Sequence, residues 1–173
     1  MSATIRHMST TIQMSEELGP RSGWGTAIEC PMASMFEILG TKTSYLIMRE
    51  AFYGATRFEE FVERTGISEP VAAARLRELT AEGLLEKVPY QEPGQRTRSA
   101  YELTEKGSDL LPVLVAMMRW GDRWLFPNGA RVELTHAECG AQVRAELRCD
   151  AGHPVPTDEL ELGLNPRRLR AAR

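Results

Sequence analysis

A chain of 173 residues, 42% apolar and 26% charged, has the composition of a soluble globular protein with one domain and extensions. Its formal net charge of −3 excludes a general attraction to nucleic acid, so contact with DNA would depend on locally placed arginines. The longest apolar run, residues 110–118, is too short to span a bilayer, and residues 1–25 lack the apolar stretch of a secretion signal. Three cysteines do not form a disulfide framework, which favours a reducing cytoplasm.

The first part of the chain predicts an arm followed by three helices. Residues 1–29 are polar and show no sustained periodicity, so we expect a flexible arm. A helical pattern then begins at the Cys30-Pro31 pair and ends before Gly40. Apolar residues at helical spacing predict two more helices, over residues 42–53 and 57–64.

The next helix, predicted over residues 68–82, has the clearest start and end signals. Ser68 occupies the N-cap position, and Pro70 lies in the first turn, where its missing N–H leaves no hydrogen bond unmade. Apolar residues recur on one side, whereas Arg77 points to the opposite side. This helix therefore has an inner face for the core and an outer face of small residues and arginine.

The period of the pattern changes after this helix. Alternation predicts two strands, residues 84–90 and 99–103, joined by a tip over residues 91–98. A long helix is predicted over residues 105–125, and its apolar residues lie nearly all round, so we expect a partner chain to cover part of it. Short strand-like stretches predict a small β-rich extension with a basic tail over residues 127–173.

This order of elements is that of a winged helix-turn-helix domain. The stretches "CPMASMFEILGTKTSYLIMREAFYGATRFEEF", "GISEPVAAARLRELTAEGLLEK", "YELTEKGSDLLPVL" and "WGDRW" resemble the HxlR-type transcriptional regulators, relatives of the MarR-like winged helices. The resemblance implies a mainly α fold with a small β-hairpin wing (α+β). It also implies three parts: the arm 1–29, a DNA-binding and dimerisation domain 30–126, and the extension 127–173.

The resemblance further implies a function. Such proteins are cytoplasmic homodimers that bind double-stranded DNA, commonly as repressors at near-palindromic operators. Helices 105–125 and 32–39 would form the dimer, and the paired recognition helices 68–82 would enter successive major grooves. No cofactor and no membrane contact are expected.

The residues expected to contact DNA lie on the recognition helix, on the wing and at helix starts. The N-terminus of the recognition helix could hold a phosphate, and Arg77 could bind guanine through two hydrogen bonds. Where family members often carry Lys and Gln, this chain has Pro70 and Ala74, which offer thymine only apolar contact. An ordinary solvated face explains the same arginines. The expected set is Lys42, Arg57, Ser68, Glu69, Pro70, Val71, Ala74, Arg75, Arg77, Arg96 and Arg98.

Cysteine and histidine residues suggest two further hypotheses. Cys30 precedes a proline at a helix start, and some members of the resembled family sense oxidants with a cysteine at this place; the alternative is a small buried residue. His136, Cys139, Cys149 and His153 could hold zinc, although polar hairpin residues explain them more simply.

A small apolar effector is a further hypothesis. The sulfur and indole side chains that could line its pocket also suit ordinary core packing. They are Met32, Met35, Met48, Met117, Met118, Trp120 and Trp124.

Two other classes of function compete with a DNA-binding regulator. The sequence contains no Walker loop, G-x-S-x-G, H-E-x-x-H or G-x-G-x-x-G motif, so we do not expect an enzyme. A winged helix that binds proteins without sequence-specific DNA binding is the stronger alternative, because the outer face of the recognition helix carries few hydrogen-bonding side chains.

Overall fold

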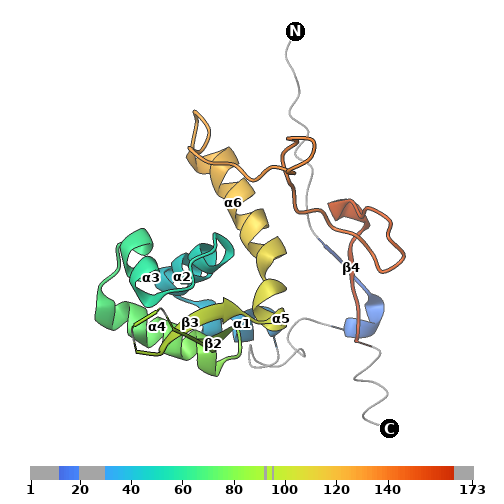
Figure 1. The fold of residues 1–173 in the computed structure, drawn as a ribbon. Helices are drawn as coiled ribbons and strands as arrows, with labels where there is room; N and C mark the ends of the chain where they lie inside the picture. The colour runs from blue at the N-terminus through green and yellow to red at the C-terminus, as the bar shows by residue number, and fades with distance from the viewer. Residues whose placement is uncertain (1–11, 20–29, 92, 95, 166–173) are drawn as a thin grey trace. The chain divides into compact units, whose positions relative to one another are not determined.

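Helices dominate the part of the chain expected to form a winged helix-turn-helix, and one hairpin interrupts them (Figure 1). The computed structural model describes residues 12–19, 30–91, 93–94 and 96–165. The first helices of this part are α1 (Pro31–Leu39), α2 (Lys42–Phe52), α3 (Phe58–Thr65) and α4 (Glu69–Ala81). The antiparallel strands β2 (Leu85–Tyr90) and β3 (Arg98–Leu103) and the helices α5 (Glu105–Ser108) and α6 (Leu111–Leu125) follow. The predicted mainly α fold with a hairpin wing is confirmed.

Hydroxyl caps and one glycine set the ends of these helices. The Thr41 hydroxyl accepts the backbone N–H of Ser44 at 3.1 Å and so begins α2. Thr104 caps α5 in the same way, through the N–H of Gly107 at 3.0 Å. α3 ends at Gly66, whose φ of 68° lies in the left-handed region that glycine adopts without strain. The chain therefore turns sharply between α3 and α4.

The core lies where α1, α2, α3, α4, the hairpin and the start of α6 meet. Phe61 of α3 is completely buried, and its ring meets the edge of the Tyr101 ring with a centroid distance of 6.1 Å. Burial of each such side chain contributes about 1.5–3 kcal/mol to the free energy of unfolding. The other large buried apolar residues of this core are Leu39, Ile47, Met48, Leu76, Leu79, Leu84, Leu85 and Leu114.

The base of the hairpin is joined tightly to α5. The Thr104 hydroxyl donates to the backbone oxygen of Gly83 at 2.6 Å. A Cβ atom added to Gly107 would overlap the backbone oxygen of Leu84. Only glycine fits where α5 passes β2, so the hairpin is fixed at its base.

The predicted single helix over residues 105–125 is wrong. The structure has two helices, α5 and α6, separated by a turn at Asp109 and Leu110. The physical reason is Pro112, which has no N–H to donate to the carbonyl group of Ser108 and so interrupts the hydrogen-bond ladder. In the described ranges, α6 and every other helix are too short or too polar to cross a membrane.

The prediction of a β-rich extension is also wrong. Beyond α6 the described chain is mostly irregular backbone, with isolated bridges between Thr135 and Gln142 and between Arg148 and Pro154. Gly140 and Gly152 adopt positive φ and reverse the chain before longer strands can form. The basic tail lies outside the described residues.

The described residues near the two ends of the chain form a unit of their own, separate from the unit within residues 28–145. β1 (Gln13–Met14) pairs in parallel with β4 (Glu161–Leu162), and short 3-10 helices, Glu16–Leu18 and Thr157–Glu159, stand beside them in sequence. The backbone N–H groups of Gln13 and Ser15 donate to Leu160 and Leu162, each at 3.0 Å. Part of the arm expected to be flexible is thus held by backbone hydrogen bonds that link sequence-distant segments.

Candidate nucleic-acid interface

The recognition helix α4 begins and ends within one residue of the predicted range. Its inner residues Ala72, Leu76 and Leu79 are buried against the core, whereas Val71 and Arg77 are exposed. α4 packs against α2, α3 and β2, so it is held from several sides. Its outer face is therefore presented on a rigid support, which specific recognition requires.

The N-terminus of α4 carries groups of opposite effect on an anion. Ser68 is the N-cap residue, and its exposed hydroxyl makes no capping hydrogen bond. Its hydroxyl and the first N–H groups of the helix suit a phosphate oxygen. The Glu69 carboxylate, in the first turn, stabilises the helix through its interaction with the helix dipole, but it repels a phosphate. Pro70 is exposed beside them, so this end of the helix is not strongly cationic.

The two arginines of α4 lie in different surroundings. Arg75 is half-buried and forms an ion pair of 2.5 Å with Glu78. Arg77 is exposed and forms no hydrogen bond or ion pair with any described residue. Arg77 is therefore available to a ligand, whereas Arg75 would first have to separate from Glu78. Ala74, the remaining predicted residue of this helix, is half-buried.

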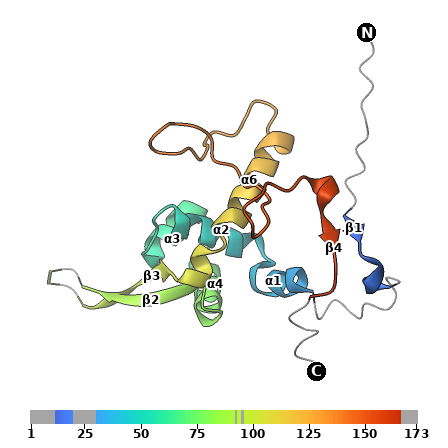
Figure 2. The ribbon, with the colours of Figure 1, turned by 90° about the vertical axis from the view of Figure 1, so that its right-hand side faces the viewer.

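The wing extends away from the helices (Figure 2). The middle of β3 is attached to the segment before α3, because the N–H of Tyr101 donates to the backbone oxygen of Thr56 at 2.7 Å. The Arg57 guanidinium lies over the Tyr90 ring, 5.1 Å from its centroid. These contacts fix the direction of the wing relative to α3 and α4.

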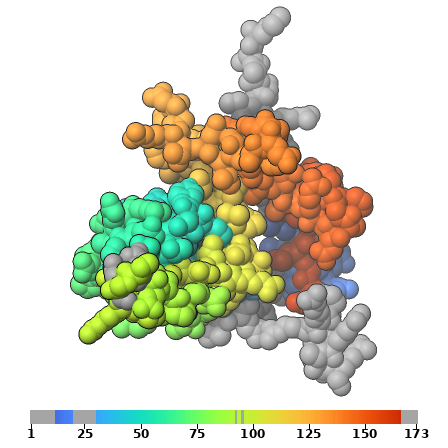
Figure 3. All heavy atoms as spheres, in the orientation of Figure 1, coloured from blue at the N-terminus to red at the C-terminus, as the bar shows by residue number. Residues whose placement is uncertain are grey.

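Of the predicted DNA-contacting cations outside α4, some already interact with neighbouring side chains and others do not. Arg98, in the strand pair nearest the tip of the wing, lies 3.7 Å from Glu59 and pairs with it. Arg96 lies beyond the last strand pair, is exposed, and has no hydrogen bond or ion pair among the described residues. Lys42, the first residue of α2, is exposed as well. α4 and the wing, green to yellow-green in Figure 3, form adjoining surface.

Sequence reasoning missed the role of Glu60 beside this surface. Its carboxylate accepts the backbone N–H groups of Thr56 at 2.8 Å and of Arg57 at 3.0 Å, and the Arg64 guanidinium at 2.7 Å. Those two N–H groups, with smaller contributions from the charges of Arg64 and Arg57, lower the pKa of Glu60 from its ordinary value of 4.5. Glu60 is the third helical residue, the position of a capping-box acid, and an arginine at the N-cap hid that signal.

The structure tests the two hypotheses for the cysteine and histidine residues, a thiol signal at Cys30 and a zinc site after α6. Cys30 is exposed at the N-cap of α1, so the interpretation as a buried apolar residue is wrong. His136 Nδ1 lies 3.2 Å from Cys139 Sγ, whereas Cys149 and His153 are joined through their backbones, N–H to oxygen, at 3.1 Å. Among the residues described, no three His, Cys, Asp or Glu side chains are grouped as ligands for a metal ion.

An extensive apolar surface lies on α6 and α1. Leu114 and Val115 of α6 are buried, but Trp120 and Trp124 are 61% and 62% exposed. Several large apolar side chains left exposed along one helix usually mark an interface. Its other large exposed members are Met32 and Phe36 of α1 and Leu111, Val113, Met117 and Leu125 of α6.

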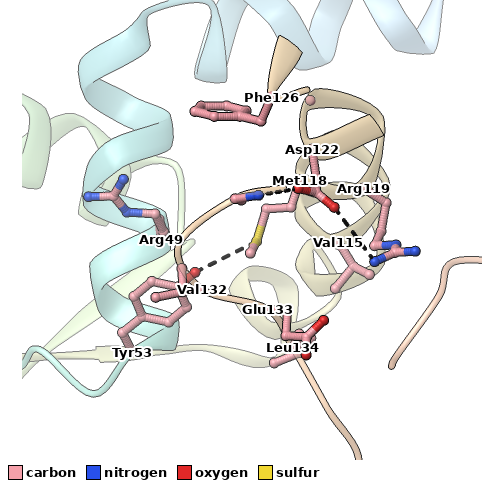
Figure 4. Close-up of a pocket in the computed structure, with 12 residues that line it drawn as sticks. Arg49, Tyr53, Val115, Met118, Arg119, Asp122, Phe126, Val132, Glu133 and Leu134 are labelled. Atoms are coloured by element: carbon pink, nitrogen blue, oxygen red, sulfur yellow. Dashed lines mark hydrogen bonds and ion pairs between the residues drawn. The ribbon is translucent and has the colours of Figure 1, made fainter. Parts of the chain in front are cut away.

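A pocket of about 300 Å³ lies between α2, α6 and the segment that follows α6 (Figure 4). Of the side chains predicted to line an effector pocket, Met118 borders it, whereas Met48 is completely buried in the core. Sequence reasoning missed most of the lining, because residues far apart along the chain contribute it. The lining comprises Arg49, Tyr53, Val115, Met118, Arg119, Gly121, Asp122, Phe126, Ala130, Val132, Glu133 and Leu134.

Known proteins share this architecture. The family model described as HxlR-like helix-turn-helix matches residues 38–129. The HTH-type transcriptional regulator Rv3095 of Mycobacterium tuberculosis is 40% identical over 114 residues, which cover 65% of this chain and 71% of that protein. The HTH-type transcriptional regulator YodB of Bacillus subtilis is 35% identical over 101 residues, 57% of this chain and 88% of that protein.

Two solved structures are also similar to this chain. The crystal structure of PA1607 superposes with a TM-score of 0.70 at 34% identity and covers 80% of this chain and 96% of that one. PA1374 of Pseudomonas aeruginosa superposes with a TM-score of 0.57 at 35% identity, over 79% of this chain and 93% of that one. The chain belongs to the HxlR-like helix-turn-helix family, and it is a transcriptional regulator with a DNA-binding helix-turn-helix domain.

Proposed function

We propose that the chain acts in the cytoplasm as a homodimeric repressor that binds a near-palindromic operator. The observation that carries this proposal is the pairing of a buried inner face on α4 with an exposed, unpaired Arg77, among the described residues, on its outer face. A rigid helix with one available guanidinium suits a bidentate contact to guanine in the major groove. Arg96 on the wing would bind the neighbouring backbone or minor groove.

The apolar surface on α6 and α1 supports the proposal of a dimer. A second copy is the partner whose surface matches, because a two-fold axis brings the same patch of each chain together. Two copies of α4 would then meet successive major grooves about 34 Å apart. The surface formed by α4 and the wing of one chain offers few unpaired cations, so binding to both half-sites is needed for high affinity.

The test is binding to a labelled DNA fragment from directly upstream of the gene, measured at several salt concentrations with an unrelated fragment as control. The proposal predicts saturable binding that prefers the upstream fragment and weakens as salt rises. Equal binding to both fragments, or none, would contradict it. That result would instead favour a winged helix that binds proteins through the apolar outer face of α4.

A thiol signal at Cys30 is part of the proposal. Its side chain is exposed at the N-terminus of α1, where an oxidant can reach it. Two copies of Cys30 across the dimer could form a disulfide when an oxidant accepts the two electrons. Treatment with diamide should change the operator affinity of the wild type and leave that of Cys30→Ser unchanged. An equal response of the two proteins would rule out this role.

A further inference from the structure

The pocket between α2 and α6 is surrounded by apolar side chains that do not close on one another. Val115 is buried at its edge, yet Tyr53, Phe126 and Val132 border the same hollow and remain about half exposed or more. Figure 4 shows these side chains arranged around the space from three parts of the chain. Apolar groups placed in this way gain free energy when a further apolar body enters between them.

The wall formed by the segment after α6 is braced. The N–H of Ala130 donates to Asp122 Oδ1 at 2.5 Å, which turns the segment back along α6. The N–H of Val143 donates to the backbone oxygen of Leu134 at 2.8 Å, and Gln142 donates to Glu133. The hollow is therefore a built feature with walls held by hydrogen bonds.

Both arginines at its rim are paired with carboxylates, and the Glu133 carboxylate accepts a hydrogen bond from the Gln142 amide. Arg49 pairs with the buried Glu50 at 2.6 Å, and Arg119 lies 4.0 Å from Asp122. An anionic ligand would have to compete with these carboxylates, and a cationic ligand would meet the guanidinium groups. The site therefore suits an uncharged molecule.

One polar group in the pocket has a weak partner. The Tyr53 hydroxyl donates to the Met118 thioether, with an oxygen–sulfur distance of 3.7 Å, and a thioether is a poor acceptor. A carbonyl oxygen of a ligand would accept this hydrogen bond more strongly. The volume of about 300 Å³ lies at the lower end of the range for small-molecule sites, which limits the ligand to about two rings.

We propose that this pocket binds an uncharged, largely apolar small molecule with one hydrogen-bond acceptor, and that its occupation changes operator affinity. The regulatory half of this proposal rests on the proposed function. Arg49 and Tyr53 come from the end of α2, which packs against α4, and Met118 comes from α6, which carries the apolar dimer surface. A ligand held between them fixes the angle between recognition helix and dimer axis, and so the spacing of the two recognition helices.

The binding test uses prodan, an uncharged fluorescent naphthalene with a single ketone. Wild-type protein should bind about one prodan per chain, and the anion anilinonaphthalene sulfonate should not displace it. Ala130→Trp, which fills the hollow, should weaken prodan binding by about tenfold. Tyr53→Phe should weaken it roughly three- to tenfold, because one hydrogen bond is lost. The matched control Ala151→Trp places the same side chain on an exposed turn and should bind prodan as the wild type does.

Absence of saturable prodan binding, or equal binding by wild type and both pocket variants, would overturn the site. In the operator assay, prodan should change the affinity of the wild type by about fivefold or more and should not change that of Ala130→Trp. Unchanged operator affinity at saturating prodan would overturn the regulatory role. If no operator binding is found even without prodan, the proposed function fails, and the fluorescence result still decides the pocket.

Discussion

Arg75 and Glu78 lie one turn apart on α4 and form an ion pair of 2.5 Å, while Arg77 between them has no described partner. Two arginines separated by a single residue thus have different roles available to them. Arg75 orders the helix surface, and Arg77 is the side chain that a ligand would meet. This difference makes the DNA-binding proposal testable one residue at a time.

Arg77→Ala should weaken operator binding by about 1–3 kcal/mol and relax the preference for one base pair in each half-site, since a bidentate contact is lost. Fluorescence anisotropy with operator variants measures both effects. Arg75→Ala is the matched control, and its loss should be smaller and independent of sequence. Equal losses for the two variants would contradict the assignment of Arg77 as the base-reading residue.

Arg96→Ala should weaken binding about equally for specific and unrelated DNA. Its guanidinium is exposed at the wing and would contact phosphate, so the dependence of affinity on salt should fall by about one counterion. The measurement is a titration at four salt concentrations. Arg131→Ala, another exposed arginine outside the interface, serves as control and should keep the wild-type slope. An unchanged slope for Arg96→Ala would remove the wing contact from the proposal.

Glu60→Gln should lower the free energy of unfolding by about 1 kcal/mol at neutral pH, because the carboxylate holds two backbone N–H groups at the start of α3. The pKa of Glu60 is lower in the folded protein than its ordinary value. Its contribution is therefore fully present above the ordinary pKa and is lost as the pH falls through the lowered value.

Urea unfolding of wild type and Glu60→Gln at a series of pH values tests this assignment. The difference between the two proteins should be constant near neutral pH and shrink below pH 4.5. A difference that does not change with pH would show that the charge of Glu60 is not responsible.

Gly107→Ala should lower the free energy of unfolding by about 1–3 kcal/mol, since a Cβ atom there would overlap the Leu84 backbone oxygen and force α5 away from β2. Gly121→Ala is a matched control in α6, where an added Cβ meets nothing within 4 Å. Helix propensity predicts that this control gains up to about 1 kcal/mol. Thermal or urea unfolding distinguishes the expected loss of stability in Gly107→Ala from the expected gain in Gly121→Ala. A Gly107→Ala variant as stable as the wild type would contradict the close approach of Gly107 to the Leu84 backbone oxygen.

Trp120→Glu should shift the protein toward monomer, because a charge would be buried at the apolar surface where the second copy is proposed to pack. Sedimentation equilibrium measures the shift. Leu147→Glu introduces the same charge at an exposed apolar residue that belongs to neither α1 nor α6 and should leave the association unchanged. If both variants associate like the wild type, α6 does not form the dimer.

The helices that local signals define were predictable from sequence. α4 was expected over residues 68–82 because Ser68 and Pro70 start it and Gly83 stops it, and the structure agrees within one residue. The break before α6 was missed because the apolar run through Pro112 was given more weight than the missing N–H of that proline.

Features that join distant residues were not predictable. The pairing of Gln13–Met14 with Glu161–Leu162 and the meeting of Tyr53 with Phe126 around the pocket leave no local pattern in the sequence. The partners of Arg75 and Arg98 likewise decide which cations remain available, and only the folded chain shows them.

Binding of DNA as a dimer is tested by the mass of the complex between the full chain and its upstream DNA fragment, measured by light scattering during gel filtration. We expect two chains on one duplex and a loss of this complex in Trp120→Glu. A single chain bound per duplex, with the same affinity in Trp120→Glu, would contradict it.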